Sequence, residues 1–113
     1  MAKKNIKTVL KTKENEIIHT SLALFLKNRI QYLEDGCKMV IDIEEDCVTM
    51  IRKNDEYEIY FHFEIGNCYG SITIPFKGTV ELDIALENLQ QKENMISIVY
   101  LLNDEKYEYC IYY

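Results

Sequence analysis

The chain has 113 residues, of which 48% are hydrophobic and 12% aromatic, and this composition excludes a disordered protein. The formal net charge of −6 argues against nucleic acid as a partner, because phosphate binding needs a basic surface that would have to outweigh nineteen carboxylates. We expect one domain over residues 1–113, with residues 1–5 as a flexible basic N-terminus.

The predicted elements of the first half are short strands separated by polar turns. Residues 6–12 are rich in β-branched side chains, and residues 39–43 and 47–52 are strand-sized apolar segments on either side of an acidic turn. Asp35-Gly36 is typical of a hairpin turn, because Gly readily adopts positive φ. The pattern therefore predicts antiparallel neighbours.

The strongest pattern lies at residues 57–63, where apolar and polar side chains alternate. Alternation of period two is typical of a strand with one face in a core, and it places Phe61 and Phe63 inward. Further strands are predicted at residues 68–74, 80–86, 95–102 and 107–113, with Val80, Leu82 and Leu86 facing the core. Polar residues 88–94 are expected to interrupt the pattern.

Residues 17–34 are ambiguous from periodicity alone. They fit two strands around Lys27-Asn28, but Leu22, Phe25 and Leu33 also fit the offsets of an amphipathic helix that Gly36 would end. About eight to ten short strands in so small a chain would leave exposed edges unless the sheet curls on itself. The expected fold is therefore all-β, a single antiparallel meandering β-barrel.

Several short motifs resemble the YwiB-like family of small bacterial proteins of unknown function. They are residues 30–34 with Tyr32 and Glu34, residues 48–52 with Arg52, and residues 63–66, 74–78 and 100–102. The resemblance covers roughly residues 5–113. It departs from the family pattern in the Pro75 to Gly78 turn, which is one residue longer, and at Lys53-Asn54, where the family usually has Gly after the arginine.

This resemblance implies a lipocalin-like, or calycin-type, β-barrel. It also implies that residues 17–34 form a hairpin that turns at Lys27-Asn28 rather than a helix. It implies no activity, since the family is itself uncharacterised.

Tyr32, Glu34 and Arg52 are the candidate ligand-binding residues. Strand parity places Glu34 on the face of Tyr32 and places Arg52 on the face of Met50, so both charges lie at the ends of apolar stripes. An isolated charge inside a barrel would be costly, so we expect the two to pair at its mouth. The pair would either fix the strand register or anchor a small acidic or phenolic ligand.

The cysteines carry no recognisable site. Cys37, Cys47, Cys68 and Cys110 contain no CxxC pair and no histidine at ligand spacing, so the sequence predicts no metal site and no cofactor. The N-terminal residues lack an apolar stretch of signal-peptide length, and the longest apolar run is too short for a membrane. We expect a cytoplasmic protein with reduced thiols.

Three functional classes follow from these observations. The first is a non-enzymatic barrel that binds a small apolar or amphipathic ligand in or at its mouth. The second is a protein-interaction module or homodimer that uses a sheet edge or the tyrosine-rich C-terminal strand around Tyr112. The third is a decarboxylase-like lyase using Tyr32, Glu34 and Arg52, for which matching residue types are weak support.

Overall fold

The computed structural model describes residues 2–113 and shows an all-β fold. The described residues contain no helix that is long and apolar enough to cross a membrane. The eleven strands are β1 (Ala2–Lys11), β2 (Glu16–Leu26), β3 (Arg29–Glu34), β4 (Cys37–Ile43), β5 (Cys47–Lys53), β6 (Glu58–Glu64), β7 (Tyr69–Ile74), β8 (Gly78–Glu81), β9 (Ile84–Lys92), β10 (Met95–Leu102) and β11 (Glu105–Tyr112).

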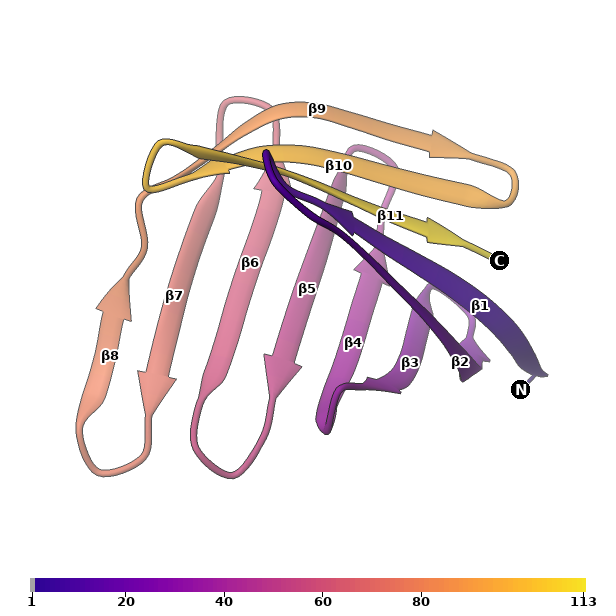
Figure 1. The fold of residues 1–113 in the computed structure, drawn as a ribbon, viewed down its shortest axis with the longest axis horizontal. Helices are drawn as coiled ribbons and strands as arrows, with labels where there is room; N and C mark the ends of the chain where they lie inside the picture. Colours follow the sequence, from indigo (N-terminus) through magenta and orange to yellow (C-terminus); the bar gives the residue numbers. More distant parts are fainter. Residues whose placement is uncertain (1) are drawn as a thin grey trace.

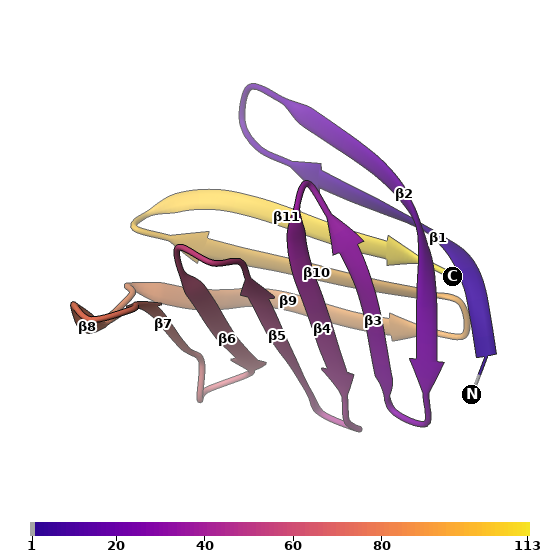
Figure 2. The same ribbon diagram turned by 90° about the horizontal axis from the view of Figure 1, so that it is seen from below.

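All the strands belong to one antiparallel sheet with the order β8-β7-β6-β5-β4-β3-β2-β1-β11-β10-β9. The sheet curls into a half-barrel, in which β3 to β8 form one layer and β9, β10, β11 and β1 lie across it (Figure 1). Figure 2 shows the same two layers from below. The long strand β2 makes the corner, because it pairs with β1 over residues 16–25 but with β3 only at residues 24–26.

The core lies between the two layers and is built from alternate residues of facing strands. Phe61 and Phe63 of β6 pack against Tyr100 of β10, with ring centroids 5.7 and 5.0 Å apart, respectively. Phe63 is fully buried, and burial of a side chain of this size contributes about 1.5–3 kcal/mol. These contacts explain how the alternation of residues 57–63 leads to a packed interior.

The hairpin turns follow their residue types. Asp35 and Gly36 both have positive φ, at 51° and 76°, as a two-residue type I′ turn requires. Lys27, in the turn between β2 and β3, has a φ of 52°. The segment that was ambiguous from periodicity is thus a hairpin, as the family resemblance implied.

Three expectations differ from the structure. The predicted strand at residues 80–86 is divided between β8 and β9, and β9 continues through the polar residues to Lys92, so the sheet has eleven strands rather than eight to ten. Val80 is 62% exposed and does not face the core, because β8 lies at the edge of the sheet. Residues 2–5, expected as a flexible segment, pair with β2 through residues 22–25; Met1 lies outside the described residues.

The sheet has two edge strands, β8 and β9, and no continuous ladder of hydrogen bonds joins them to close the barrel. The backbone N–H of Leu82 donates to the carbonyl of Gly70 over 2.9 Å, which brings the chain back onto β7. A Cβ atom at Gly70 would lie 3.0 Å from the Phe61 ring and 3.2 Å from Ile84. Glycine therefore permits the close approach of β9 to the first layer.

Candidate functional site

The two layers meet at a buried carboxylate, Glu34, whose residue is 7% exposed. Glu34 is the last residue of β3, directly before the Asp35-Gly36 turn, and parity points it inward with Ile30 and Tyr32. Arg52 lies on β5 opposite Met39 of β4, so it is diagonal to Glu34 across one intervening strand. The first layer thus provides both members of the predicted pair.

The predicted ion pair is present. Nη1 of Arg52 lies 3.2 Å from Oε1 of Glu34, and the Arg52 side chain is 27% exposed. The same Nη1 lies 3.6 Å from the sulfur of Met39. Arg52 therefore sits at the margin of the interior, with its guanidinium on Glu34 and Met39 and part of the side chain exposed.

The second layer provides two hydroxyl donors to the other oxygen of the carboxylate. Oγ1 of Thr8, on β1, donates to Oε2 of Glu34 over 2.6 Å, and the hydroxyl of Tyr109, on β11, donates to it over 2.9 Å. The Tyr109 oxygen lies 2.6 Å from that of Tyr32. Since Tyr109 has one hydroxyl hydrogen and gives it to Glu34, it accepts from Tyr32. The result is a relay from Tyr32 through Tyr109 to the carboxylate.

The relay affects how its tyrosines ionise. Burial is the main cause that raises the pKa of Tyr109 above its ordinary value, and the neighbouring Tyr32 and Glu34 raise it further. Burial likewise raises the pKa of Tyr32, although its hydrogen bond to Tyr109 opposes the shift. Both phenols therefore stay protonated at neutral pH and act as hydrogen-bond donors.

Arg52 remains a cation in this setting. Partial burial lowers the pKa of Arg52, but the neighbouring Tyr57, Cys37 and Glu34 outweigh that effect and leave the pKa above its ordinary value. The candidate site thus contains a fixed positive group beside neutral hydroxyls and a carboxylate whose oxygens are already hydrogen-bonded.

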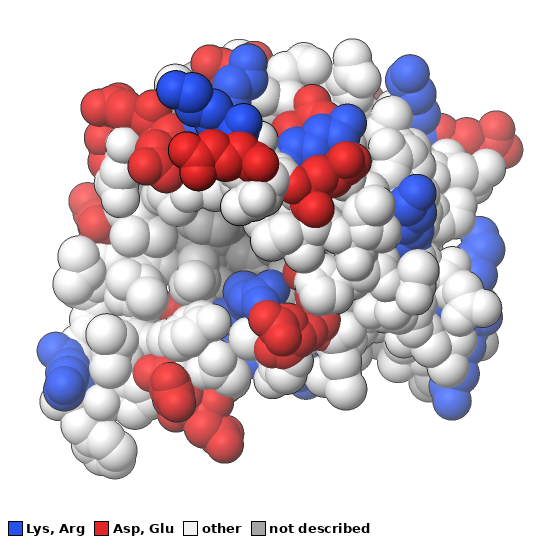
Figure 3. Space-filling view, in the orientation of Figure 1, with Lys and Arg blue, Asp and Glu red and all other residues white. Residues whose placement is uncertain are grey.

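A cavity of about 240 Å³ opens beside this network. Figure 3 shows a hollow near the middle of the molecule's face, with both basic and acidic atoms at its rim. Apolar side chains form most of the cavity wall: Leu10, Ile17, Met39, Met50, Ile59, Phe61 and Tyr100. The polar lining residues are Thr8, His19, Glu34, Asp35, Arg52 and Tyr109.

Two of the three predicted site residues line this cavity. Glu34 and Arg52 line the cavity, whereas Tyr32 lies behind Tyr109 and lines an outer depression with Leu22 and Leu33. Tyr109 and Thr8 were missed by the sequence reasoning. Tyr109 lies two residues before the buried Ile111 and so on the same face of β11, but no local signal shows that it meets a residue on β3.

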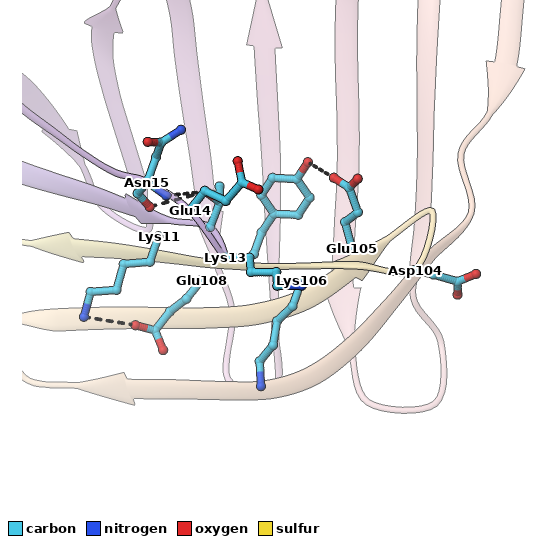
Figure 4. Close-up of a pocket in the computed structure, with 10 residues that line it drawn as sticks. Lys11, Lys13, Glu14, Asn15, Asp104, Glu105, Lys106 and Glu108 are labelled. Carbon is cyan, nitrogen blue, oxygen red and sulfur yellow. Dashed lines mark hydrogen bonds and ion pairs between the residues drawn. The ribbon is translucent and has the colours of Figure 1, made fainter.

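A larger hollow of about 940 Å³ lies between the β1–β2 and β10–β11 turns (Figure 4). Its walls carry charges of both signs: Lys11 pairs with Glu108 at 3.4 Å, and the neutral Tyr107 hydroxyl donates a hydrogen bond to Glu105 over 3.2 Å. Lys11 is half-exposed at the side chain, so these groups keep their hydration. We therefore place the candidate ligand site at the smaller, partly apolar cavity.

The described residues also bring together possible metal ligands on the outer face of the first layer. Atoms of Cys47, His62 and Glu64 that could bind a metal all lie within 4.8 Å of one another. Sequence spacing missed this group because its members come from two paired strands. All four cysteines are free thiols, with Cys37 and Cys110 buried.

The fold and site define an all-β half-barrel with a carboxylate–tyrosine–arginine network beside an interior cavity. A structural comparison finds the same fold in the crystal structure of the YwiB protein from Bacillus subtilis, with a TM-score of 0.63 and 20% sequence identity over 95% of this chain and 85% of that chain. No protein-family model matches the sequence, and a search of curated proteins gives no significant match. This similarity supports a YwiB-like fold. It does not show that the fold is lipocalin-like.

Proposed function

We propose that this protein binds a small ligand with an apolar body and an anionic group in the cavity beside Glu34 and Arg52. The observation that carries the proposal is the coincidence of the 240 Å³ cavity with the charged network at its margin. Ligand sites typically combine apolar walls with a few convergent polar groups. The volume lies just below the usual range for drug-sized ligands, which favours a ligand of about one ring.

Arg52 is the group that selects an anion, although the carboxylate of Asp35 also lines the cavity. The carboxylate of Glu34 already accepts from Thr8, Tyr109 and Arg52, so it has little capacity left for a ligand donor. Arg52 has five N–H groups on a planar head, and part of that head is accessible. His19, on β2, lines the same cavity and is a second candidate donor.

Methionine methyl groups give a direct test. Met39 and Met50 line the cavity, whereas Met95 lies at the start of β10 and does not. In protein labelled with ¹³C at the methionine methyls, benzoate should shift the Met39 and Met50 signals and leave that of Met95 unchanged. For so small a probe we expect a Kd of about millimolar. Benzyl alcohol, which lacks the charge, should bind more weakly.

Two variants decide whether Arg52 anchors the ligand. Arg52→Met should abolish the benzoate shifts while the protein remains folded. Arg29→Met is the matched control, because Arg29 pairs with Asp42 on an exposed surface at 2.7 Å and does not line the cavity. Shifts that survive Arg52→Met, or that affect Met95 equally, would reject the proposed site.

The edge strand β8 supports a second candidate function, association with another copy of the chain. β8 leaves one side unpaired, and Ile74, Phe76 and Val80 of the β7–β8 hairpin are exposed. Unpaired edges with apolar side chains favour pairing between chains. The C-terminal strand cannot serve as that edge, because β11 already pairs with β1 and β10.

Native mass spectrometry of protein purified from its own host would test both functions at once. A retained small molecule lost in Arg52→Met supports ligand binding. A dimer that dissociates in Val80→Lys supports association through β8. A monomer without added mass would count against both.

A further inference from the structure

We infer a metal site for a divalent cation of the zinc type, formed by Cys47, His62 and Glu64 on the outer face of β5 and β6. The site is independent of the ligand cavity. On β5, Val48 and Met50 face the core, whereas Cys47 and Thr49 face the opposite side of the sheet. On β6, Phe61 and Phe63 face the core, so His62 and Glu64 also lie on the outer face.

The sheet register holds the three side chains together. Cys47 and Glu64 are direct cross-strand partners, and His62 lies two residues before Glu64 on the same face. Partners in an antiparallel pair have Cβ atoms about 4.5–5.5 Å apart, and diagonal neighbours are within reach of long side chains. The convergence therefore comes from backbone pairing and does not depend on a mobile loop.

The distances between the ligand atoms are close to those of a metal site. The thiol, imidazole and carboxylate atoms lie within 4.8 Å of one another. Nε2 of His62 and Oε1 of Glu64 are 2.8 Å apart, joined by a hydrogen bond. Zinc bonds of about 2.0–2.3 Å in a tetrahedron place ligands about 3.3–3.6 Å apart. A metal would thus take the place of the hydrogen between His62 and Glu64 as the ligand atoms of these two side chains move slightly apart.

Neighbouring groups orient the ligands. Oγ1 of Thr49 lies 3.5 Å from Nδ1 of His62, and the Asn67 side chain donates to Glu64 over 3.4 Å. The Cys47 thiol donates to Glu44 over 3.5 Å. Partners of this kind fix the ring and carboxylate positions in metal sites. The His62 and Glu64 side chains are 23% and 38% exposed, so a cation can enter from solvent.

The ligand types identify the class of metal. Thiolate and imidazole ligands favour zinc and its neighbours in the first transition row over magnesium or calcium, which prefer oxygen. On binding, the Cys47 thiol releases one proton to solvent, and neutral His62 moves its single N–H hydrogen from Nε2, where it bridges to Glu64, to Nδ1, so that Nε2 is free to bind the ion. One thiolate and one carboxylate then balance the two positive charges of the ion. Three protein ligands leave a fourth position for water.

Cobalt(II) is the probe for this site, because a bound thiolate gives a near-ultraviolet charge-transfer band. One equivalent of cobalt should produce the band, and zinc should displace it. Cys47→Ser should abolish the band, while Cys110→Ser should retain it, because Cys110 is buried on β11. No band with excess cobalt, or a band that survives Cys47→Ser, would overturn the inference.

The other two ligands are tested by affinity. Loss of groups that merely orient a ligand costs about 10–100-fold in metal affinity, so His62→Gln and Glu64→Gln should each raise the cobalt Kd at least about 100-fold. His19→Gln, which removes the other histidine, should not change it. Circular dichroism checks that each variant is folded. If Cys47→Ser unfolds, the cobalt Kd of Glu64→Gln decides, because this substitution is at a more exposed side chain. An unchanged Kd in Glu64→Gln would exclude this ligand set.

Discussion

The hydroxyl of Tyr109 donates to the carboxylate of Glu34 over 2.9 Å, although 75 residues separate them in the chain. This bond joins β11 to β3 and so connects the two layers of the half-barrel. Thr8 makes a second connection of the same kind, from β1. Both bonds are buried, where a hydrogen bond to a charged group contributes about 1.5–3 kcal/mol. The candidate site is therefore also part of what holds the layers together.

The ion pair between Glu34 and Arg52 should be strongly coupled. Arg52→Met should destabilise by about 3 kcal/mol, since it leaves the buried carboxylate without its cation. Glu34→Gln should cost about 1–3 kcal/mol, because it weakens three hydrogen bonds. The double variant should lose less than the sum, since no unpaired charge remains. Urea denaturation measures all three.

A salt bridge on the surface provides the comparison for this double-mutant cycle. Arg29 and Asp42 are 2.7 Å apart on an exposed part of β3 and β4, with Arg29 half-exposed. Arg29→Met should cost no more than about 1 kcal/mol. Equal losses at Arg29 and Arg52, or strict additivity in the double variant, would contradict a coupled interior pair.

The two faces of β6 should differ in their tolerance of alanine. Phe61 is 8% exposed and lies 5.4 Å from the Phe63 ring, so Phe61→Ala should cost about 3–5 kcal/mol through lost burial and the resulting cavity. Glu58 is on the other face, with a 43% exposed side chain and a Lys53 contact of 3.9 Å, so Glu58→Ala should cost little. Equal effects in urea melts would reject these orientations.

The alternation of side chains along each strand was sufficient to predict which face of the sheet most of them occupy. It placed Glu34 with Tyr32 and Arg52 with Met50, and the structure confirms both placements. It was wrong for Val80, because alternation records a strand's two faces but not whether a second layer covers one of them. At the edge of the half-barrel nothing packs over that residue's side of β8.

The contacts between the layers could not be predicted. Thr8 and Tyr109 meet Glu34 only because the sheet curls at β2, and the curl depends on how strands pair over the whole chain. The group Cys47, His62 and Glu64 needs the β5–β6 register, which follows once the Asn54 turn is fixed. Such clusters can be found from sequence only by writing out the register of each hairpin.

Alkaline pH should weaken the fold through the buried relay. The pKa of Tyr109 and that of Tyr32 are raised above the ordinary 10.0 by burial first of all. The unfolded chain therefore loses these protons at a lower pH than the native protein does. The stability contribution is complete below about pH 10 and falls as pH rises from there toward the native pKa values.

The variant Tyr109→Phe isolates one of these groups. It should be less stable than the wild type at pH 7, because Glu34 loses a donor, yet its free energy of unfolding should fall less steeply above pH 10. Urea denaturation at several pH values gives the slopes, and tyrosinate absorbance gives the titration. An unchanged slope would show that Tyr109 ionises normally in the folded protein.

The β7–β8 turn should become more stable when Phe76 is replaced by glycine. Phe76 has a φ of 66° and a fully exposed ring, so it contributes no burial while its backbone is in the left-handed region. That conformation costs about 1–2 kcal/mol for a residue with a Cβ, and the extra unfolded-state entropy of glycine offsets about 0.5–1 kcal/mol. Phe76→Gly should therefore stabilise by about 0.5–1 kcal/mol in thermal or urea unfolding. Phe76→Ala is the matched control and should gain nothing, because alanine keeps the strain. If Phe76→Ala stabilised as much as Phe76→Gly, the exposed ring and not the backbone would be the source of the cost.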